Sequence, residues 1–468
     1  MRARLAALAL VAIVAVGCGS AGGSSTPDGA GLVPTDALAY VSLDTDLGSG
    51  QLQSAQSVLD KFPLKAQVLR QIHTAIAKSG IDLTALESSI GPELDLAVLQ
   101  VNGKTAVVGI THPKDEKTFD AQLAKGSPPP VHTTIDGWTV FSDTQAAIDA
   151  VRNRAGQLAD DASYQDAVKT LPAAGDAIVR AYVSPAGARA AAGAASGGLG
   201  TAGSSLGTLG ADAKWSTAAL TSHDGAFELQ VHAKTTTGAS AVSGAGLADE
   251  IPSGSIVALS LTGGTGAIPA GTEQQLGGFS QQLGIDLQAL VGVLDGPVIA
   301  YVRPGLPLPD VTLAAQPAHP EDAVKAVGQL VAKLAHGAGT PVPTTVDGGT
   351  LNKVDLGSIA LYYGVADGKL VVTDSANALA ELNGSVGHLS GDDVFKEAKD
   401  AAGMPDTSQG FLFVDLKDAL PAAEGLARLA NQAIPPQVDA NLKPLRSLLV
   451  YGTRDAGLQS LVAYLKTS

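Results

Sequence analysis

A four-residue phrase, Gly-Ile-Asp-Leu, occurs twice in this chain and constrains its fold more than any other feature. It stands at 80–83 and returns at 284–287. Each copy leads through an apolar stretch to a Gly-Pro pair, at 91–92 and 296–297, and then to a strand-like run, LDLAVLQV or VIAYV. A pattern repeated in this way predicts two related modules in tandem.

Matches elsewhere extend the repeat over most of the chain. Val33-Pro34 corresponds to Ile251-Pro252, and Asp136-Gly137 corresponds to Asp367-Gly368. A chain of 468 residues with 45% apolar content can form two cores without disulfides. The predicted parts are a lipoprotein signal peptide at 1–17, a flexible tether at 18–31, module one at 32–235, a small-residue linker at 236–248 and module two at 249–468.

Strand-like stretches joined by tight turns recur in both modules. Asn102-Gly103 and Asp136-Gly137 have the composition that two-residue hairpins prefer. Hairpins outnumber parallel crossovers, so the predicted fold class is α+β, with a mainly antiparallel sheet and helices packed on one face of each module. The stretches LNKVDL (351–356) and IALYYGV (359–365) predict a hairpin that module two has and module one lacks.

The N-terminus predicts export and a lipid anchor. Two arginines precede an apolar run from Leu5 to Val16, which has roughly the length of a signal-peptide core. Ala15-Val16-Gly17-Cys18 resembles the lipobox of bacterial lipoproteins, which implies lipidation of Cys18 on the outer face of the cytoplasmic membrane. Cys18 is the only cysteine, so an intramolecular disulfide is impossible. The alternative is an ordinary signal peptide that leaves a spare thiol.

The charge balance argues against several classes of partner. Removal of Arg2 and Arg4 with the signal peptide leaves 28 basic residues against 45 acidic ones, a balance of −17. No cluster of lysine and arginine provides the basic surface that nucleic acids require, so no nucleic-acid partner is expected. The eight histidines form no helical pair of metal ligands, and no phosphate-binding loop is present in the sequence. We therefore predict no cofactor and no metal.

The segment at 186–213 breaks the symmetry between the modules. It is rich in glycine, alanine and serine, whereas its counterpart in module two has a good apolar helical face. A helical start followed by a mobile loop is expected. The segment is a candidate lid over an apolar cavity, and the alternative is low-complexity drift without a function.

One serine motif suggests hydrolysis. Gly203-Ser204-Ser205-Leu206-Gly207 matches the G-x-S-x-G pattern of a nucleophile elbow. The elbow requires a strand before the serine and a helix after it, but both flanks here are rich in small residues. The composition therefore favours a chance match over a catalytic Ser205.

One histidine and one aspartate recur at matching places in the two modules. His112 and His319 are each followed three residues later by an aspartate, which permits an acid/base pair or a ligand pair. The favoured interpretation is a strand-to-helix junction in which the aspartate caps or complements the helix. Asp82 and Asp286 recur within the repeated phrase, and capping is again favoured over catalysis. No catalytic residue is predicted.

Several phrases resemble a known family. The opening VPTDALAYVSLDTD, the phrase DKFP, GIDL leading to GPELDLAVL, and DGWTVFSDTQAAI look like secreted bacterial lipoproteins catalogued as domain of unknown function 3352. The resemblance covers essentially the whole mature chain and implies an envelope location. It brings no known catalytic residues, so it implies none here.

The sequence favours a non-enzymatic, membrane-anchored envelope lipoprotein. The first hypothesis is a binding or carrier module for an apolar ligand such as a lipid, because the chain combines an anchor with low charge density and small apolar residues. The alternative is an envelope protein-interaction or scaffold module that uses a sheet edge or the 186–213 segment. A serine hydrolase at Ser205 is the third hypothesis.

Overall fold

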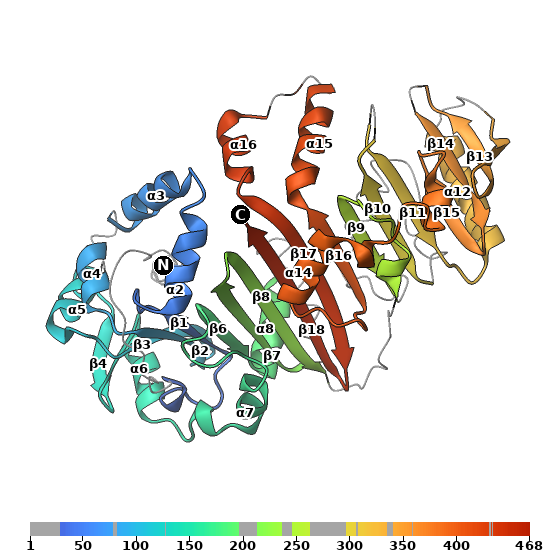
Figure 1. Cartoon of the computed structure of the whole chain (residues 1–468). Helices are drawn as coiled ribbons and strands as arrows, with labels where there is room; N and C mark the ends of the chain where they lie inside the picture. Colours follow the sequence, from blue (N-terminus) through green and yellow to red (C-terminus); the bar gives the residue numbers. More distant parts are fainter. Residues whose placement is uncertain are drawn as a thin grey trace. The chain divides into compact units, whose positions relative to one another are not determined.

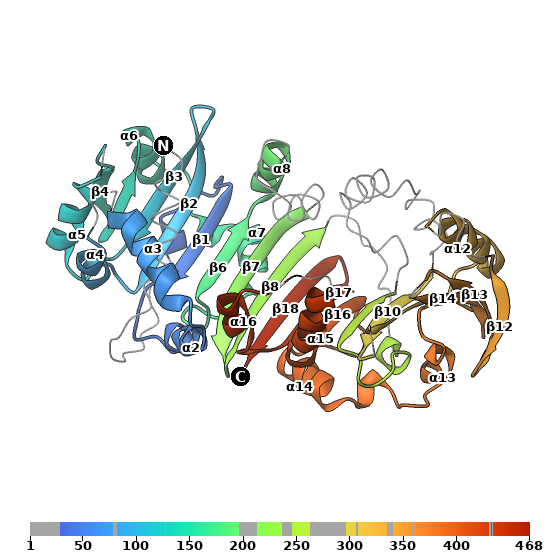
Figure 2. The same cartoon turned by 90° about the horizontal axis from the view of Figure 1, so that it is seen from above.

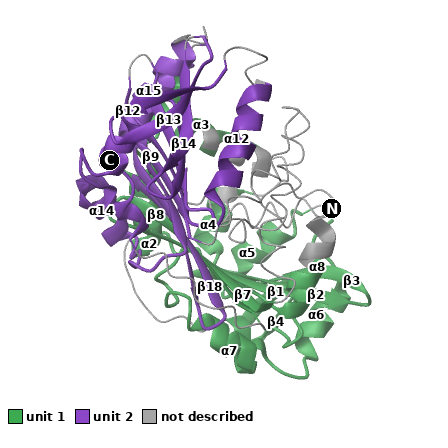
Figure 3. Cartoon of the chain, turned by 90° about the vertical axis from the view of Figure 1, so that its right-hand side faces the viewer, with its two compact units in different colours: residues 1–238, 437–444, 467–468 green, residues 239–436, 445–466 purple. Residues whose placement is uncertain are grey.

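The chain divides into two compact units, shown in a computed structural model (Figure 3). Unit 1 comprises Met1–Gly238, Gln437–Pro444 and Thr467–Ser468, and unit 2 comprises Ala239–Pro436 and Leu445–Lys466. Each unit combines antiparallel strands with helices, so the predicted α+β class is confirmed at this level. The residues that the structure describes are 29–77, 82–126, 128–195, 213–235, 246–262, 296–305, 308–334, 340–357, 359–429, 432 and 434–468.

Unit 1 is built on antiparallel strands (Figure 1). In the order in which they pair, these strands are β4 (Val131–Ile135), β5 (Trp138–Ser142), β3 (Lys104–Thr111), β2 (Glu93–Val101), β1 (Ala39–Asp44), β6 (Val179–Val183), β7 (Ala213–His223) and β8 (Ala226–Thr235). The first strand in the sequence is thus central, with later strands added on both sides of it.

Two-residue turns join three of these pairs. Both residues of each turn have positive φ, which is the type I′ geometry that asparagine or aspartate followed by glycine favours. The predicted hairpins are therefore confirmed. The turns are Asn102-Gly103 between β2 and β3, Asp136-Gly137 between β4 and β5, and Asp224-Gly225 between β7 and β8.

One face of the unit 1 sheet is covered by α2 (Gly50–Leu59), α4 (Leu83–Ser89) and α5 (Glu116–Leu123). Leu43 from β1 and Leu94 from β2 are buried in the cluster formed with α4 and α5. Both residues are almost inaccessible to solvent, so this contact removes apolar surface from water and stabilises the unit.

A further helix covers the opposite face, which corrects the predicted one-sided packing. Tyr164 of α7 (Ala162–Val168) makes edge-on contacts with Tyr40 and Tyr182, at ring-centroid distances of 6.0 and 5.2 Å. Tyr40 and Leu43 point to opposite faces because side chains alternate along β1. Since Tyr40 and Leu43 are both buried, each face of β1 has a covering layer, and Figure 1 shows α4 and α7 on opposite sides of the sheet.

Two C-terminal pieces of the chain also belong to unit 1. Thr467 Oγ1 donates to the Gly225 carbonyl at 2.7 Å and lies 2.9 Å from Lys61 Nζ. Asn441 Oδ1 accepts a hydrogen bond from the Leu64 amide at 2.9 Å. The repeat in the sequence did not indicate that these C-terminal residues belong to unit 1. The other helical segments are α3 (Lys65–Ala77), α6 (Gln145–Arg152), α8 (Pro185–Ala195), α16 (Pro436–Leu442), η1 (Gly29–Gly31) and η2 (Leu158–Asp160).

Unit 2 pairs its strands in a corresponding order. The strands are β12 (Val342–Val346), β13 (Gly349–Asp355), β14 (Ala360–Ala366), β15 (Lys369–Thr373), β11 (Asp310–Ala315), β10 (Val298–Arg303), β9 (Val257–Leu261), β16 (Gly410–Asp415) and β17 (Leu445–Asp455). After a two-residue turn at Ala456-Gly457, β18 (Leu458–Thr467) completes the chain. All of these pairs are antiparallel.

Helices cover both faces of unit 2 as well. α12 (Pro320–Leu334) packs on the face that carries Tyr363 and Leu370. Phe395 of α14 (Asp393–Ala401) packs on the other face, with ring-centroid distances of 5.2 Å to Phe411 and 5.3 Å to Phe413. The other helical segments are α13 (Ala378–Leu382), α15 (Leu416–Leu429), η3 (Leu247–Asp249) and η5 (Leu389–Gly391).

The two strand orders differ at one end (Figure 2). The order β4–β5–β3–β2–β1–β6–β7 in unit 1 corresponds to β14–β15–β11–β10–β9–β16–β17 in unit 2, because β4 and β14 each lead into the next strand through an Asp-Gly turn. The predicted pairing of the 351–356 and 359–365 stretches is confirmed as β13 and β14. However, the strands without a counterpart in the described part of unit 1 are β12 and β13.

The Phe395→Ala variant tests the packing on the α14 face. Removing this fully buried ring should lower the free energy of unfolding of unit 2 by about 3–5 kcal/mol. The neighbouring Val394 is 39% exposed, so Val394→Ala should change the same quantity by less than about 0.5 kcal/mol. Urea unfolding followed by circular dichroism measures both, and equal effects would contradict the assigned core.

Candidate functional site

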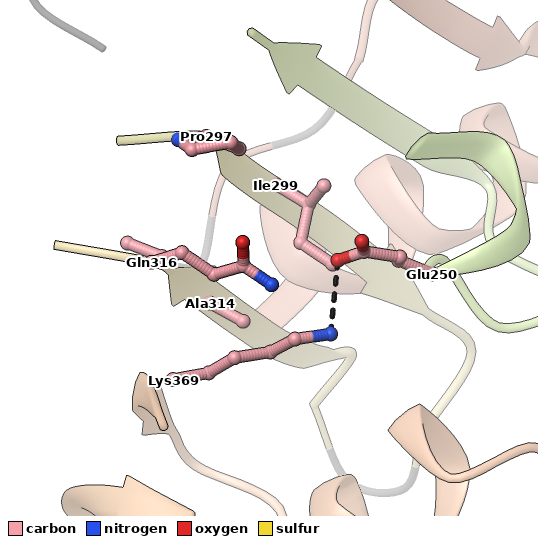
Figure 4. Close-up of a pocket in the computed structure, with 7 residues that line it drawn as sticks. Glu250, Pro297, Ile299, Ala314, Gln316 and Lys369 are labelled. Atoms are coloured by element: carbon pink, nitrogen blue, oxygen red, sulfur yellow. Dashed lines mark hydrogen bonds and ion pairs between the residues drawn. The ribbon is translucent and has the colours of Figure 1, made fainter. Parts of the chain in front are cut away.

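A shallow hollow on unit 2 combines charged and apolar side chains (Figure 4). It has an empty volume of about 170 Å³, which includes open space at its mouth. We refer to it as the unit 2 hollow. Its lining residues are Glu250, Pro297, Ile299, Ala314, Ala315, Gln316 and Lys369.

The floor of the hollow is the beginning of β10 and the end of β11. Ile299 and Ala314 are directly opposite each other in this pair, and the Gln316 amide donates to the Pro297 carbonyl at 2.9 Å. A Cβ atom on Gly296 would lie 1.7 Å from the Gln316 carbonyl oxygen. Only glycine permits this close approach of two backbone segments, which explains the Gly-Pro pair at 296–297.

The first copy of the Gly-Pro pair has the same explanation. A Cβ atom on Gly91 would lie 2.2 Å from the carbonyl oxygen of His112, the residue that follows β3. His112 therefore corresponds to Gln316, which follows β11. The repeated glycine is a structural requirement at the end of this hairpin and not a phosphate-binding feature.

An ion pair forms the rim of the hollow. Glu250 follows η3, Lys369 begins β15 directly after the Asp-Gly turn, and their Oε2 and Nζ atoms lie 2.9 Å apart. The side chains are 32% and 26% exposed, so solvent screens the pair, and we expect it to contribute less than about 1 kcal/mol to stability. A weak, partly exposed ion pair can exchange its partners for the charges of a ligand.

The corresponding place in unit 1 is filled. Counting from the shared Val/Ile-Pro and Asp-Gly pairs, Glu250 and Lys369 correspond to Leu32 and Trp138, which are both buried. The Trp138 ring also contacts the ring of His112 edge-on at 6.0 Å. Unit 1 thus has two buried apolar residues at the positions where unit 2 has a charged pair, and the hollow lies beside the charged pair.

Unit 2 also has an enclosed polar cluster. Arg303 Nη1 donates to Glu381 Oε1, and these side chains are 19% and 9% exposed. Thr312 Oγ1 and Thr373 Oγ1 are 2.8 Å apart, and burial raises the pKa of the nearby Tyr301 hydroxyl above its ordinary value. In unit 1, the positions that correspond to Tyr301 and Arg303 hold alanine and leucine.

His112 and His319, which match in the sequence, both lie between a strand and a helix, but they are not equivalent in the structure, where His112 corresponds to Gln316. Asp115 caps α5 by accepting hydrogen bonds from the Thr118 amide at 3.0 Å and from Thr118 Oγ1 at 2.6 Å. These bonds hold the pKa of the Asp115 carboxyl below its ordinary value. His319 directly precedes Pro320, the first residue of α12. The geometry supports the capping interpretation, because the Asp115 carboxylate is engaged by its own helix.

The other predicted residues divide into two groups. Asp82 caps α4, accepting from the Ala85 amide at 3.2 Å, and α8 provides the expected helical start of the 186–213 segment. Cys18, Ser205 and Asp286 lie outside the described residues. Their predicted roles, and the loop or lid expected after α8, stay predictions.

Sequence reasoning missed the unit 2 hollow. Its signal was present, because the matched positions set Leu32 against Glu250 and Trp138 against Lys369, so that both differ as apolar against charged. Neither change falls in a motif, so a search for motifs did not find them. Glu250 and Lys369 are 119 residues apart in the sequence, and only the folded chain brings them together.

In the described ranges, no helix combines the length and apolar character needed to cross a membrane. Histidine, cysteine and acidic side chains of the same ranges form no group of three suited to a metal ion. No known protein family matches this chain, and no curated protein is significantly similar to it.

Removing the carboxylate from each of the two ion pairs shows which pair stabilises unit 2. Glu381→Gln leaves Arg303 enclosed without its counter-charge, so the free energy of unfolding should fall by about 3–5 kcal/mol. Glu250→Gln leaves a more exposed Lys369, and the loss should stay below about 1 kcal/mol. Urea unfolding of both variants tests the assignment, which would be wrong if Glu250→Gln were the more damaging change.

Proposed function

We propose that this chain is a non-enzymatic lipoprotein of the cell envelope that binds an amphiphile at the unit 2 hollow. The lipid anchor at Cys18 places it on the outer face of the cytoplasmic membrane in this proposal. The mature chain consists of two related modules, 32–235 and 249–468, derived from one ancestral unit. Support for the duplication comes from the corresponding strand orders and from the repeated Gly-Pro and Asp-Gly positions.

The observation that carries the binding proposal is the composition of the hollow. An apolar floor of Pro297, Ile299 and Ala314 lies beside one carboxylate and one ammonium group. A ligand with a zwitterionic head satisfies both charges, since its cation replaces Lys369 at Glu250 and its anion replaces Glu250 at Lys369. The hollow is shallow and its volume of about 170 Å³ includes open space, so the charged head of the ligand lies at the rim and the rest of the ligand lies outside the hollow.

Filling the hollow tests this proposal. The double variant Glu250→Leu with Lys369→Trp gives unit 2 the residues of unit 1 and should remain folded, because replacing an ion pair by apolar groups is often neutral. Its affinity for dihexanoyl phosphatidylethanolamine, used below its micelle concentration, should fall at least about tenfold by calorimetric titration.

A surface variant and a second lipid provide the controls. Lys325 lies on α12 with its side chain 73% exposed, so Lys325→Trp should leave binding unchanged. Dihexanoyl phosphatidylglycerol has the same tails but no ammonium group, and it should bind more weakly to the unaltered chain. Equal affinity of the filled variant and the unaltered chain would refute the proposed site.

The anchor is tested separately with Cys18→Ser. The unaltered chain should enter the detergent phase of a Triton X-114 extract of the producing cells and incorporate labelled palmitate. The serine variant should do neither, because a hydroxyl group cannot form the thioether on which lipidation depends. Unchanged partitioning of the variant would exclude Cys18 as the anchor.

A further inference from the structure

The edge strand β4 of unit 1 differs from its counterpart in unit 2. β4 pairs with β5, and no other described strand pairs with it. The corresponding strand β14 pairs with β15 on one side and with β13 on the other. Unit 2 thus provides an example of how this position in the sheet accepts one more antiparallel strand.

The backbone of β4 presents pairing groups on its outer side. In a hairpin closed by a two-residue turn, the residues that flank the turn are hydrogen-bonded to each other, and the pattern alternates from there. Ile135 and Thr133 therefore bond to β5, and the amide and carbonyl groups of His132 and Thr134 point away from it. Counting from the same turn, His132 corresponds to Tyr363, which is opposite Asn352 of β13.

Acidic side chains flank this edge on the α5 side. Thr134 Oγ1 lies 3.2 Å from Glu116 Oε1, and His132 Nε2 lies 3.6 Å from Asp120 Oδ1. The His132 and Asp120 side chains are 36% and 38% exposed, and the Asp120 oxygen that faces His132, Oδ1, is the buried one of its carboxylate. A lysine or arginine on an added strand, opposite His132 and on the same face, would meet these two carboxylates.

We infer that β4 is a docking edge that accepts one extended, lysine- or arginine-bearing strand of a second protein. The added strand runs antiparallel to β4 and bonds to the backbone groups of His132 and Thr134. The α5 carboxylates select the basic side chain. The short edge limits pairing to a few hydrogen bonds, so the complex is specific in register and modest in affinity.

Two labelled peptides test the inference on the full mature chain. The first has the sequence of residues 348–356, which include β13, and the second is the same peptide with the substitution Asn352→Lys. Both should bind saturably in fluorescence anisotropy, and the lysine peptide should bind several-fold more tightly. Asp120→Asn or high salt should abolish that difference, because the gain depends on charge.

Two variants of one residue separate the backbone from the side chain. His132→Pro removes an outward amide but keeps the bonds to β5, so peptide affinity should fall at least about tenfold. His132→Ala keeps the amide and should bind within about twofold of the unaltered chain. Circular dichroism checks that both are folded, and Thr134→Pro replaces His132→Pro if the latter is not.

Hydrogen exchange on the unaltered chain gives an independent result. The amides of His132 and Thr134 should become protected when peptide is added, and those of β12 should not change. Absence of saturable binding by either peptide, or equal binding by the proline and alanine variants, would overturn the inference. A dimer of the unaltered chain that His132→Pro dissociates in light scattering would also overturn it, by assigning the edge to a second copy.

Discussion

The structure depends on central strands that must be buried on both faces. Tyr40 and Leu43 of β1 point in opposite directions and are both nearly inaccessible. Burial of both faces requires two covering layers, which α4 and α5 provide on one side and α7 on the other. In unit 2, Phe395 packs on β16, which neighbours β9, on the face opposite α12. Burial of both faces therefore determines where the helices pack. The unit 2 hollow and the β4 edge lie outside these buried layers.

Those features differ between the units at corresponding positions. Unit 1 fills the place at the end of its β2–β3 hairpin with the apolar Leu32 and Trp138, whereas unit 2 has Glu250 and Lys369 there. The sheet edges differ in the opposite way. Unit 2 extends its edge with β12 and β13, whereas β4 is the last strand on this side among the described residues of unit 1. The hollow is therefore accessible in unit 2 and the sheet edge is accessible in unit 1. This difference is consistent with separate functions for two units of similar strand order.

Local sequence predicted local structure well. Asp-Gly and Asn-Gly dipeptides located the turns, and Asp82 and Asp115 were identified as helix caps. One-sided helix packing was wrong because it was inferred from the hairpin connections, which do not show that Tyr40 and Leu43, on opposite faces of β1, are both buried. The hollow and the C-terminal pieces of unit 1 could not be predicted, since Lys369 meets Glu250 and Thr467 meets Gly225 only through long-range pairing.

Binding of an amphiphile at the unit 2 hollow is the proposal on which the function of this chain depends. Native mass spectrometry of the chain, extracted from the membrane of its own cells, measures that binding without an added ligand. We expect a bound zwitterionic amphiphile, one per chain, that is absent when Glu250 and Lys369 are replaced by leucine and tryptophan. A chain that carries only its own anchor, or the same bound molecule in both proteins, would refute the proposal.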